Sequence, residues 1–383
     1  MRFSFDPEQL AVLEVVEEFA QKELAPFVDE MQEKDQLPEH FFEKAGETGL
    51  IGIAMPEEYG GLGMSHETLM AALAAIGKAA PGPVISITTT LAGLEIIRKH
   101  GTQEQKDKYL SDGVAGRLVA GMAFTEAGTG SDPKQLTTTA AEDGDHVVLN
   151  GVKRFITNAA FPGPQVIFAK DADTGLCSAY IIDKFCAGYS LSTPWEKIGT
   201  KGSPVYDVFL DNVRVPKSSL LGERGAGFAI LLSESSVGKM AHGAACLGMM
   251  EACRDLAIKY AKEKLHRGKP ITKFQAIQLK IAKICEKTES VKWMLYRCAQ
   301  LADESTQSEE FKAYAAMMKA YAADTAPEVA LMAMNVMGAY GPMKEYSVER
   351  FLRDAVMEPH VEVASDVQRV IAASYYIDRF RPN

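Results

Sequence analysis

Apolar residues recur at helical spacing through the first third of the chain. Asp6, Pro7 and Gln9 form the capping-box pattern of a helix N-terminus, with proline in the first turn. The apolar residues after them are spaced as on one helix face as far as Pro26. The same spacing predicts further helices over residues 37–48, 66–78, 91–99 and 102–110.

The hydrophobic period changes near Leu118. Short runs of β-type residues occupy positions 119–125, 137–141, 146–149, 165–169, 179–182 and 206–210. The pairs Asp143-Gly144 and Asn150-Gly151 have the sequence of tight turns between strands. Short strands with frequent turns predict a small sandwich or barrel.

Helical spacing returns after Pro216. Predicted helices cover 227–262, 275–302, 308–337, 347–357 and 363–377, and the longer ones are typical of a helical bundle. A chain of 383 residues is long enough for two or three domains. We therefore predict an α+β multidomain fold, with an N-terminal helical domain (1–117), a central β-barrel or sandwich domain (118–222) and a C-terminal helical bundle (223–383).

Composition and charge narrow the function classes. The net charge is −10 and no long Lys/Arg run is present, which argues against nucleic-acid binding. No apolar run approaches the ~20 residues of a membrane span, and the N-terminus lacks the apolar core of a signal peptide. The six cysteines form no Cys-x-x-Cys pair and the seven histidines are dispersed, so we predict a cytoplasmic protein without a metal site.

Three segments could carry chemistry. In residues 123–132 a β-type run ends in a Gly-rich loop that carries hydroxyl groups. Such a loop either binds a phosphate or a polar ring, or is a plain turn between strands. In the segment 149–158, Phe155 could pack on a planar cofactor beside Thr157, or could simply be buried in a hairpin. Glu362 follows a predicted helix among apolar residues, and a lone glutamate is most often solvated.

Taken together and in order, these segments resemble the flavin-dependent acyl-CoA dehydrogenases. The resemblance covers nearly the whole chain. It rests on the segments 57–63 (EEYGGLG), 100–110 (HGTQEQKDKYL), 124–132 (FTEAGTGSD), 155–158 (FITN), 197–203 (KIGTKGS), 213–216 (VRVP), 221–228 (LGERGAGF) and 268–271 (GKPI). Each motif is modest alone, but their joint occurrence in the family's order is specific.

The resemblance implies a fold, a cofactor and a reaction. It implies a helical domain, a β-domain and a four-helix bundle, with non-covalent FAD between the last two and its ADP end reaching a neighbour in a homotetramer. It implies removal of an α-proton by a carboxylate and of a β-hydride by the flavin, giving the 2-enoyl-CoA. The backbone N–H of the catalytic glutamate and a ribityl hydroxyl then stabilise the developing enolate. An electron-transferring flavoprotein is the implied electron acceptor.

The resemblance also assigns roles residue by residue. Phe124 and Thr125 contact the flavin ring, Phe155 packs on the isoalloxazine, and Thr157 forms a hydrogen bond near the flavin N5. Ser131 lies near CoA and the FAD phosphates. The residues implied for the ADP part of FAD are Phe274, Gln275, Asn335, Gly338 and Ala339, with Lys264 where the family has a cross-subunit arginine.

The catalytic segment departs from the family pattern. Glu362 lies eight positions after Asp354, the family's spacing for the base, but Val361, Val363 and Ala364 replace Tyr, Gly and Thr. The family's other base position is Gly238 here, which leaves Glu362 as the predicted base.

Two further differences concern the substrate. Lys239 stands where the family has an arginine near CoA. Thr88, Thr89 and Thr90 correspond to the floor of the acyl pocket, and are either a polar floor or a solvated run before a helix. Two alternatives stay open: a variant enzyme acting on a cyclic or already unsaturated acyl-CoA with another base, and a catalytically silent CoA-ester or flavin-binding relative.

Overall fold

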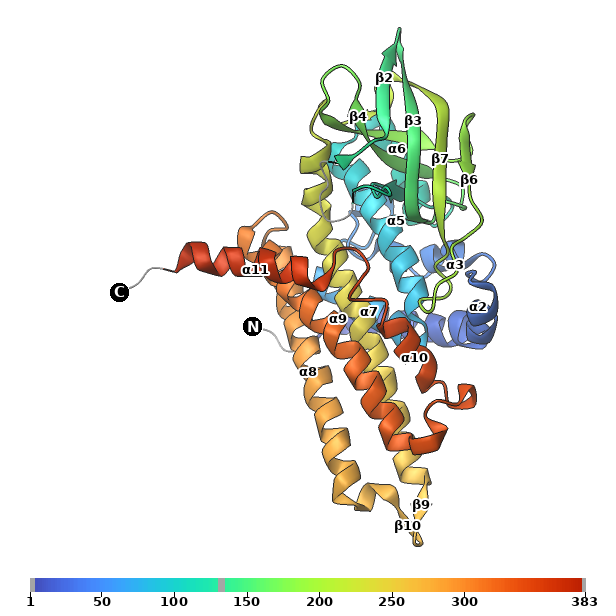
Figure 1. Ribbon diagram of the computed structural model, residues 1–383, viewed down its shortest axis with the longest axis vertical. Coiled ribbons are helices and arrows are strands. Elements are labelled where there is room, and N and C mark those ends of the chain that lie inside the picture. The colour runs from blue at the N-terminus through green and yellow to red at the C-terminus, as the bar shows by residue number, and fades with distance from the viewer. Residues whose placement is uncertain (1–3, 130–134, 381–383) are drawn as a thin grey trace.

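The computed structural model describes residues 4–129 and 135–380, and has a helical N-terminal part, a β-domain and a long helical bundle (Figure 1). The N-terminal helices are α1 (Pro7–Phe19), α2 (Val28–Lys34), α3 (Phe41–Glu47), α4 (His66–Ala79), α5 (Pro81–His100) and α6 (Gln103–Val114). The Asp6–Gln9 capping box is confirmed, because both of its hydrogen bonds form. The predicted domain order, helical, β and helical, is confirmed.

Eight strands make one sheet in the order β6-β7-β3-β2-β4-β5-β8, with β1 paired to β4. The strands are β1 (Gly121–Ala123), β2 (Thr139–Asp143), β3 (His146–Thr157), β4 (Pro164–Asp171), β5 (Cys177–Asp183), β6 (Tyr189–Leu191), β7 (Val205–Pro216) and β8 (Leu220–Leu221). The predicted turn at Asp143-Gly144 is confirmed, with Gly144 at φ +60°. The turn predicted at Asn150-Gly151 is wrong, because β3 continues through it with a register shift against β7.

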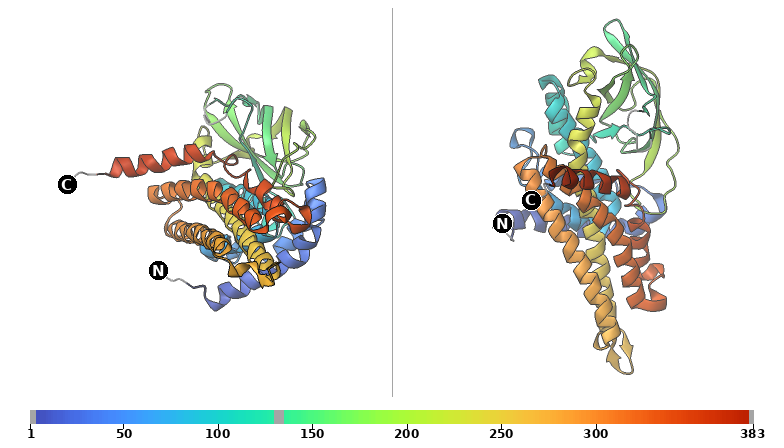
Figure 2. Two further views of the ribbon diagram at one scale, coloured as in Figure 1. Left: turned by 60° about the horizontal axis from the view of Figure 1, so that its bottom comes forward. Right: turned by 60° about the vertical axis from the view of Figure 1, so that its left-hand side comes forward.

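The C-terminal part consists of α7 (Gly227–Glu263), α8 (Gln275–Glu304), α9 (Glu309–Met337), α10 (Val348–Ala355) and α11 (Ser365–Arg379). The small hairpin of β9 (Leu265–His266) and β10 (Lys269–Pro270) joins α7 to α8 at the end of the bundle farthest from the sheet (Figure 1). α7 runs the length of the bundle, whereas α11 projects sideways from it (Figure 2). α7 therefore connects the β-domain with the distal hairpin.

Buried polar contacts fix the β-domain on the helices. The Asn158 side chain, just after β3, donates to the Ser86 carbonyl at 2.8 Å and to Thr90 Oγ1 at 3.0 Å on α5. The Thr200 N–H, beyond β6, donates to Asp354 Oδ1 on α10 at 2.6 Å. These contacts bring the end of β3 and the C-terminal segment to the same side of the molecule.

The threonine run does not precede a helix, because all three residues lie within α5. The Thr88, Thr89 and Thr90 hydroxyls each donate to the carbonyl four residues earlier. Their donors are therefore satisfied within the helix, so the run is less polar toward a ligand than its composition indicates.

Candidate active site

Glu362 lies in the loop between α10 and α11 and reaches toward α7. Its Oε1 accepts a hydrogen bond from Ser235 Oγ at 3.0 Å, and its Oε2 accepts one from Gln368 Nε2 at 3.2 Å. Its backbone is left-handed, with φ +62°, whereas Val363 is not among the residues with positive φ. The valine in place of the family's glycine is thus accommodated without strain, and the unusual conformation belongs to Glu362 itself.

The α7 face beside this carboxylate is formed by Ser235 and by Gly238 and Lys239, which follow it by three and four residues. Apart from the nearby backbone of α7 itself, no atom of the described residues lies within 4 Å of a Cβ built on Gly238, so this face borders open space. Glu362 therefore directs a carboxylate toward this face, whereas the family's second base position is Gly238, which has no side chain.

Lys239 is 6% exposed and makes no hydrogen bond or ion pair with another residue between 4–129 and 135–380. Burial lowers the pKa of its ammonium, and the Glu362 carboxylate opposes that shift. A buried cation that makes no hydrogen bond within the described residues is suited to an anionic or carbonyl-bearing ligand.

The residues predicted to meet the flavin ring lie on or beside β1 and β3. Phe155 is 54% exposed with φ +57°, and its ring centroid lies 5.3 Å from that of Trp195. Phe124 is half-buried, Thr125 is exposed and Thr157 is half-buried. An exposed aromatic pair fits the face of a planar ring such as the flavin, and Thr157 lies two residues from Phe155 on the same strand.

A buried ion pair holds the loop that carries Phe124 and Thr125. Lys153 Nζ donates to Glu126 Oε1 at 2.7 Å and to the carbonyls of Phe124 at 3.2 Å and Phe168 at 2.6 Å. Burial raises the pKa of Glu126, but the Lys153 ammonium and hydrogen bonds from Thr137 and Thr138 outweigh it and lower the pKa to about 2. Ser131, predicted to contact CoA and the FAD phosphates, lies outside the described residues.

The residues predicted to contact the ADP part of FAD lie at the distal end of the bundle. They are Lys264, Phe274, Gln275, Asn335, Gly338 and Ala339, all in the segments that join α7 to α8 or end α9. Within one chain, these residues do not come close to the residues predicted to contact the flavin ring. The sheet and the β9–β10 hairpin lie at opposite ends of the molecule (Figure 1). Exposed apolar side chains also gather there, with Leu265 59% and Leu279 65% exposed.

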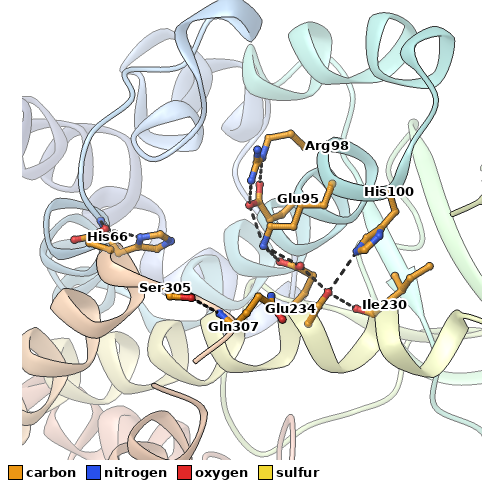
Figure 3. Close-up of polar contacts among 11 residues, drawn as sticks. His66, Glu95, Arg98, His100, Ile230, Glu234, Ser305 and Gln307 are labelled. Atoms are coloured by element: carbon orange, nitrogen blue, oxygen red, sulfur yellow. Dashed lines mark hydrogen bonds and ion pairs between the residues drawn. The ribbon is translucent and has the colours of Figure 1, made fainter. Parts of the chain in front are cut away.

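A second polar cluster lies between α5 and α7 (Figure 3). Glu95 pairs with Arg98 at 2.6 Å, and Lys99 pairs with Glu234 at 3.0 Å. An open cavity of about 530 Å³ beside it is lined by Lys99, His100, Gly222, Glu223, Ala226, Ala229, Ile230, Ser233 and Gln307. Glu362 and the α7 residues beside it, Ser235, Gly238 and Lys239, are not among the residues that line this cavity.

Sequence reasoning missed several residues around the predicted site. Ser235 stands four positions before Lys239, and this helical spacing could have placed it on the same face. Glu126 and Lys153 could not be paired from sequence, because their contact depends on the fold of β3 against the preceding loop. In the described ranges, no His, Cys, Asp and Glu side chains are grouped for a metal ion, and none of the helices is long and apolar enough to span a membrane.

Family models match along the chain in the same order as its structural parts. The N-terminal domain model of acyl-CoA dehydrogenase matches residues 6–117, the middle domain model 121–213 and the C-terminal domain model 225–376.

Full-length relatives agree with these matches. A 3-(aryl)acrylate reductase of Clostridium sporogenes is 35% identical over 375 residues, covering 97% of this chain and 98% of the relative. The CarC subunit of the caffeyl-CoA reductase-Etf complex of Acetobacterium woodii is 34% identical over 382 residues, covering 98% of this chain and 100% of the relative. Butyryl-CoA dehydrogenase from Megasphaera elsdenii has a similar structure, with a TM-score of 0.94 and 29% identity over 98% of this chain and all of that one. The chain therefore belongs to the acyl-CoA dehydrogenase family, FAD-dependent oxidoreductases that act on the CH–CH bond of acyl-CoA thioesters.

Proposed function

We propose that this chain dehydrogenates an acyl-CoA with Glu362 as the catalytic base. The observation that carries the proposal is the position of the Glu362 carboxylate. Ser235 and Gln368 hold one oxygen each, and the adjoining α7 face borders open space at Gly238. A thioester lying in that space has its α-carbon within reach of the carboxylate.

The chain's own residues account for most of the reaction. The Glu362 N–H holds the thioester oxygen, so that negative charge developing there is stabilised and the α-proton becomes acidic. The Glu362 carboxylate takes that proton. Phe155 and Thr157 hold the cofactor ring, and Lys239 lies against the CoA arm. FAD, when bound, supplies the acceptor for the β-hydride.

Anaerobic flavin bleaching tests the proposed activity. The purified protein is mixed with a panel of saturated acyl-CoAs that differ in chain length, branching and ring content. We expect at least one of them to bleach the flavin and to yield the corresponding 2-enoyl-CoA. A flavin-loaded protein that no member of the panel bleaches would support the silent relative instead.

The relatives' names favour a second direction of the same chemistry. A 3-(aryl)acrylate reductase and a caffeyl-CoA reductase subunit are both similar to the chain over nearly their whole length. By microscopic reversibility, Glu362 would then return a proton to the α-carbon of an unsaturated thioester. Reoxidation of the dithionite-reduced protein by cinnamoyl-CoA, faster than by crotonyl-CoA, would indicate this aryl-enoyl reductase.

The proposal includes a homotetramer in the cytoplasm that exchanges electrons with an electron-transferring flavoprotein. The residues predicted to contact the flavin ring and those predicted to contact the ADP part of FAD lie at opposite ends of one chain, and this separation supports the assembly. So do the exposed apolar residues Ile377 of the projecting α11, 70% exposed, and Phe380 directly after it, 76% exposed. Similarity to a subunit of a reductase-Etf complex supports the partner. Light scattering tests the assembly, and a stable flavin-loaded monomer contradicts it.

A further inference from the structure

A fully buried lysine, Lys319 on α9, contacts the loop that carries Glu362. Its side chain is 0% exposed. Its Nζ donates to the backbone carbonyls of Glu358 at 2.8 Å, Val361 at 3.0 Å and Val363 at 2.9 Å. A lysine ammonium has three N–H donors, so all of its hydrogen-bonding capacity is directed at this loop.

The contact with Val361 has a consequence for the neighbouring amide. In a trans peptide the C=O and N–H point in opposite directions, and the described chain has no cis peptide bond. Because the Val361 carbonyl points at Lys319, the Glu362 N–H points away from α9. This N–H donates to no other group in the described part of the chain, so it is free to hold a thioester oxygen.

Lys319 also explains how Glu362 keeps a left-handed backbone without glycine. A non-glycine residue in this region is strained unless the surrounding structure holds it there. The carbonyls on either side of Glu362, those of Val361 and Val363, both converge on the same ammonium. Hydrogen bonds to a charged donor are stronger than those to a neutral one, and two of them restrain the backbone on either side of Glu362.

The loop has a second anchor nearby. Glu358 is 0% exposed and its Oε2 lies 2.9 Å from His242 Nδ1 on α7. The peptide after Glu358 leads into Pro359, which has no N–H, so the Glu358 carbonyl serves only for attachment. Of the three carbonyls held by Lys319, the one at Val361 is thus the carbonyl that sets the direction of the Glu362 N–H.

We propose that Lys319 is a positioning residue for catalysis, which turns the 361–362 peptide so that the Glu362 N–H meets the thioester oxygen. This inference rests on the proposed role of Glu362. It differs from a purely structural role, because it predicts that loss of Lys319 weakens polarisation of the bound thioester and not only the stability of the fold.

The test compares Lys319→Met with Phe311→Leu. Methionine keeps the length of the side chain and removes the donors, while Phe311 is an equally buried α9 residue outside the loop contacts. Crotonyl-CoA labelled with ¹³C at the thioester carbon is bound to each flavin-loaded protein, and the carbonyl stretch is measured by infrared difference spectroscopy. Flavin reduction by the active acyl-CoA and the melting temperature are measured in parallel.

We expect Lys319→Met to lose most of the downshift of the carbonyl band and to slow flavin reduction by about 10²-fold, the usual effect of losing an oxyanion donor. Phe311→Leu, although destabilised, should keep both properties. A Lys319→Met protein with the wild-type band shift and rate overturns the proposal, as does an equal loss in Phe311→Leu.

Two further variants keep the outcome unambiguous. If Lys319→Met does not fold, Lys319→Leu is measured. Leucine has no donor for the Val361 carbonyl, so it should show the same two losses, and wild-type values overturn the proposal. Glu362→Gln keeps the N–H and should retain the band shift while losing reduction. A Glu362→Gln protein that reduces normally refutes the proposed base, while the band shift still reports on Lys319.

Discussion

Replacing Glu126 by glutamine should destabilise the β-domain although the two side chains have the same shape. The Glu126 carboxylate accepts four hydrogen bonds and donates none. Oε1 accepts from Lys153 Nζ at 2.7 Å and the Thr138 N–H at 3.0 Å, and Oε2 accepts from the Thr137 N–H at 2.6 Å and hydroxyl at 2.5 Å. A glutamine NH₂ in either position faces two donors, and Lys153 loses its counter-charge while 0% exposed.

The expected loss follows from this geometry. Removing one partner of a buried ion pair costs about 3–5 kcal/mol of unfolding free energy. With an unfolding entropy of about 2.1 cal/mol/K per residue, this corresponds to a drop in melting temperature of about 4–6 °C if the chain unfolds as one unit. Because Lys153 also holds the Phe124 carbonyl, we expect weaker retention of FAD during gel filtration.

The matched control is Glu142→Gln in the same domain. Glu142 pairs with Lys217 at 2.6 Å, but both side chains are 47% exposed, and such pairs contribute about 0–1 kcal/mol. Calorimetry and flavin absorbance of the two variants are compared at neutral pH. Equal melting temperatures and equal flavin content in Glu126→Gln and Glu142→Gln would refute the reasoning.

Three more predictions concern single side chains. Ser235→Ala removes one hydrogen bond to the Glu362 carboxylate, and stopped-flow flavin reduction should slow by roughly tenfold with an unchanged melting temperature; an unchanged rate contradicts the prediction. Lys239→Met should raise the KM for acyl-CoA by roughly tenfold or more while flavin content stays the same, and a changed kcat with constant KM would count against it. Burial lowers the pKa of Lys184 to about 7, so the unfolded chain, with its ordinary lysine, binds more protons between about pH 7 and pH 10.5. Stability relative to Lys184→Met should therefore rise by roughly 1–2 kcal/mol from pH 7 to pH 9 in urea titrations, and a flat difference would contradict the shift.

Local rules predicted much of the fold because they act within a few residues. The Asp6 capping box and the Asp143-Gly144 turn form as expected, since each is satisfied by neighbouring atoms. Asn150-Gly151 has an equally good turn sequence but lies inside β3. A Cβ at Gly151 would come within 2.4 Å of Thr138 Oγ1, so the glycine is needed for close approach between strands.

The residues of the predicted site also fall into two groups, those that spacing along the sequence identifies and those that only packing brings together. The family's eight-residue spacing from Asp354 identified Glu362, and spacing along α7 could have connected Ser235 with Lys239. The support of the catalytic loop by Lys319 could not be predicted, because an alanine-rich helix gives no sign that its lysine is buried against carbonyls 39 to 44 residues away. Long-range contacts of this kind follow from packing and not from local sequence.

The central claim is that the Glu362 carboxylate removes the α-proton, and one substitution tests it most directly. Glu362→Gln keeps the side chain's shape and the backbone N–H but cannot accept a proton at neutral pH. Anaerobic stopped-flow mixing with the acyl-CoA that bleaches the wild type should show normal FAD content and slower reduction, by roughly 10²–10⁴-fold. A glutamine variant that bleaches at the wild-type rate would show that another group takes the proton.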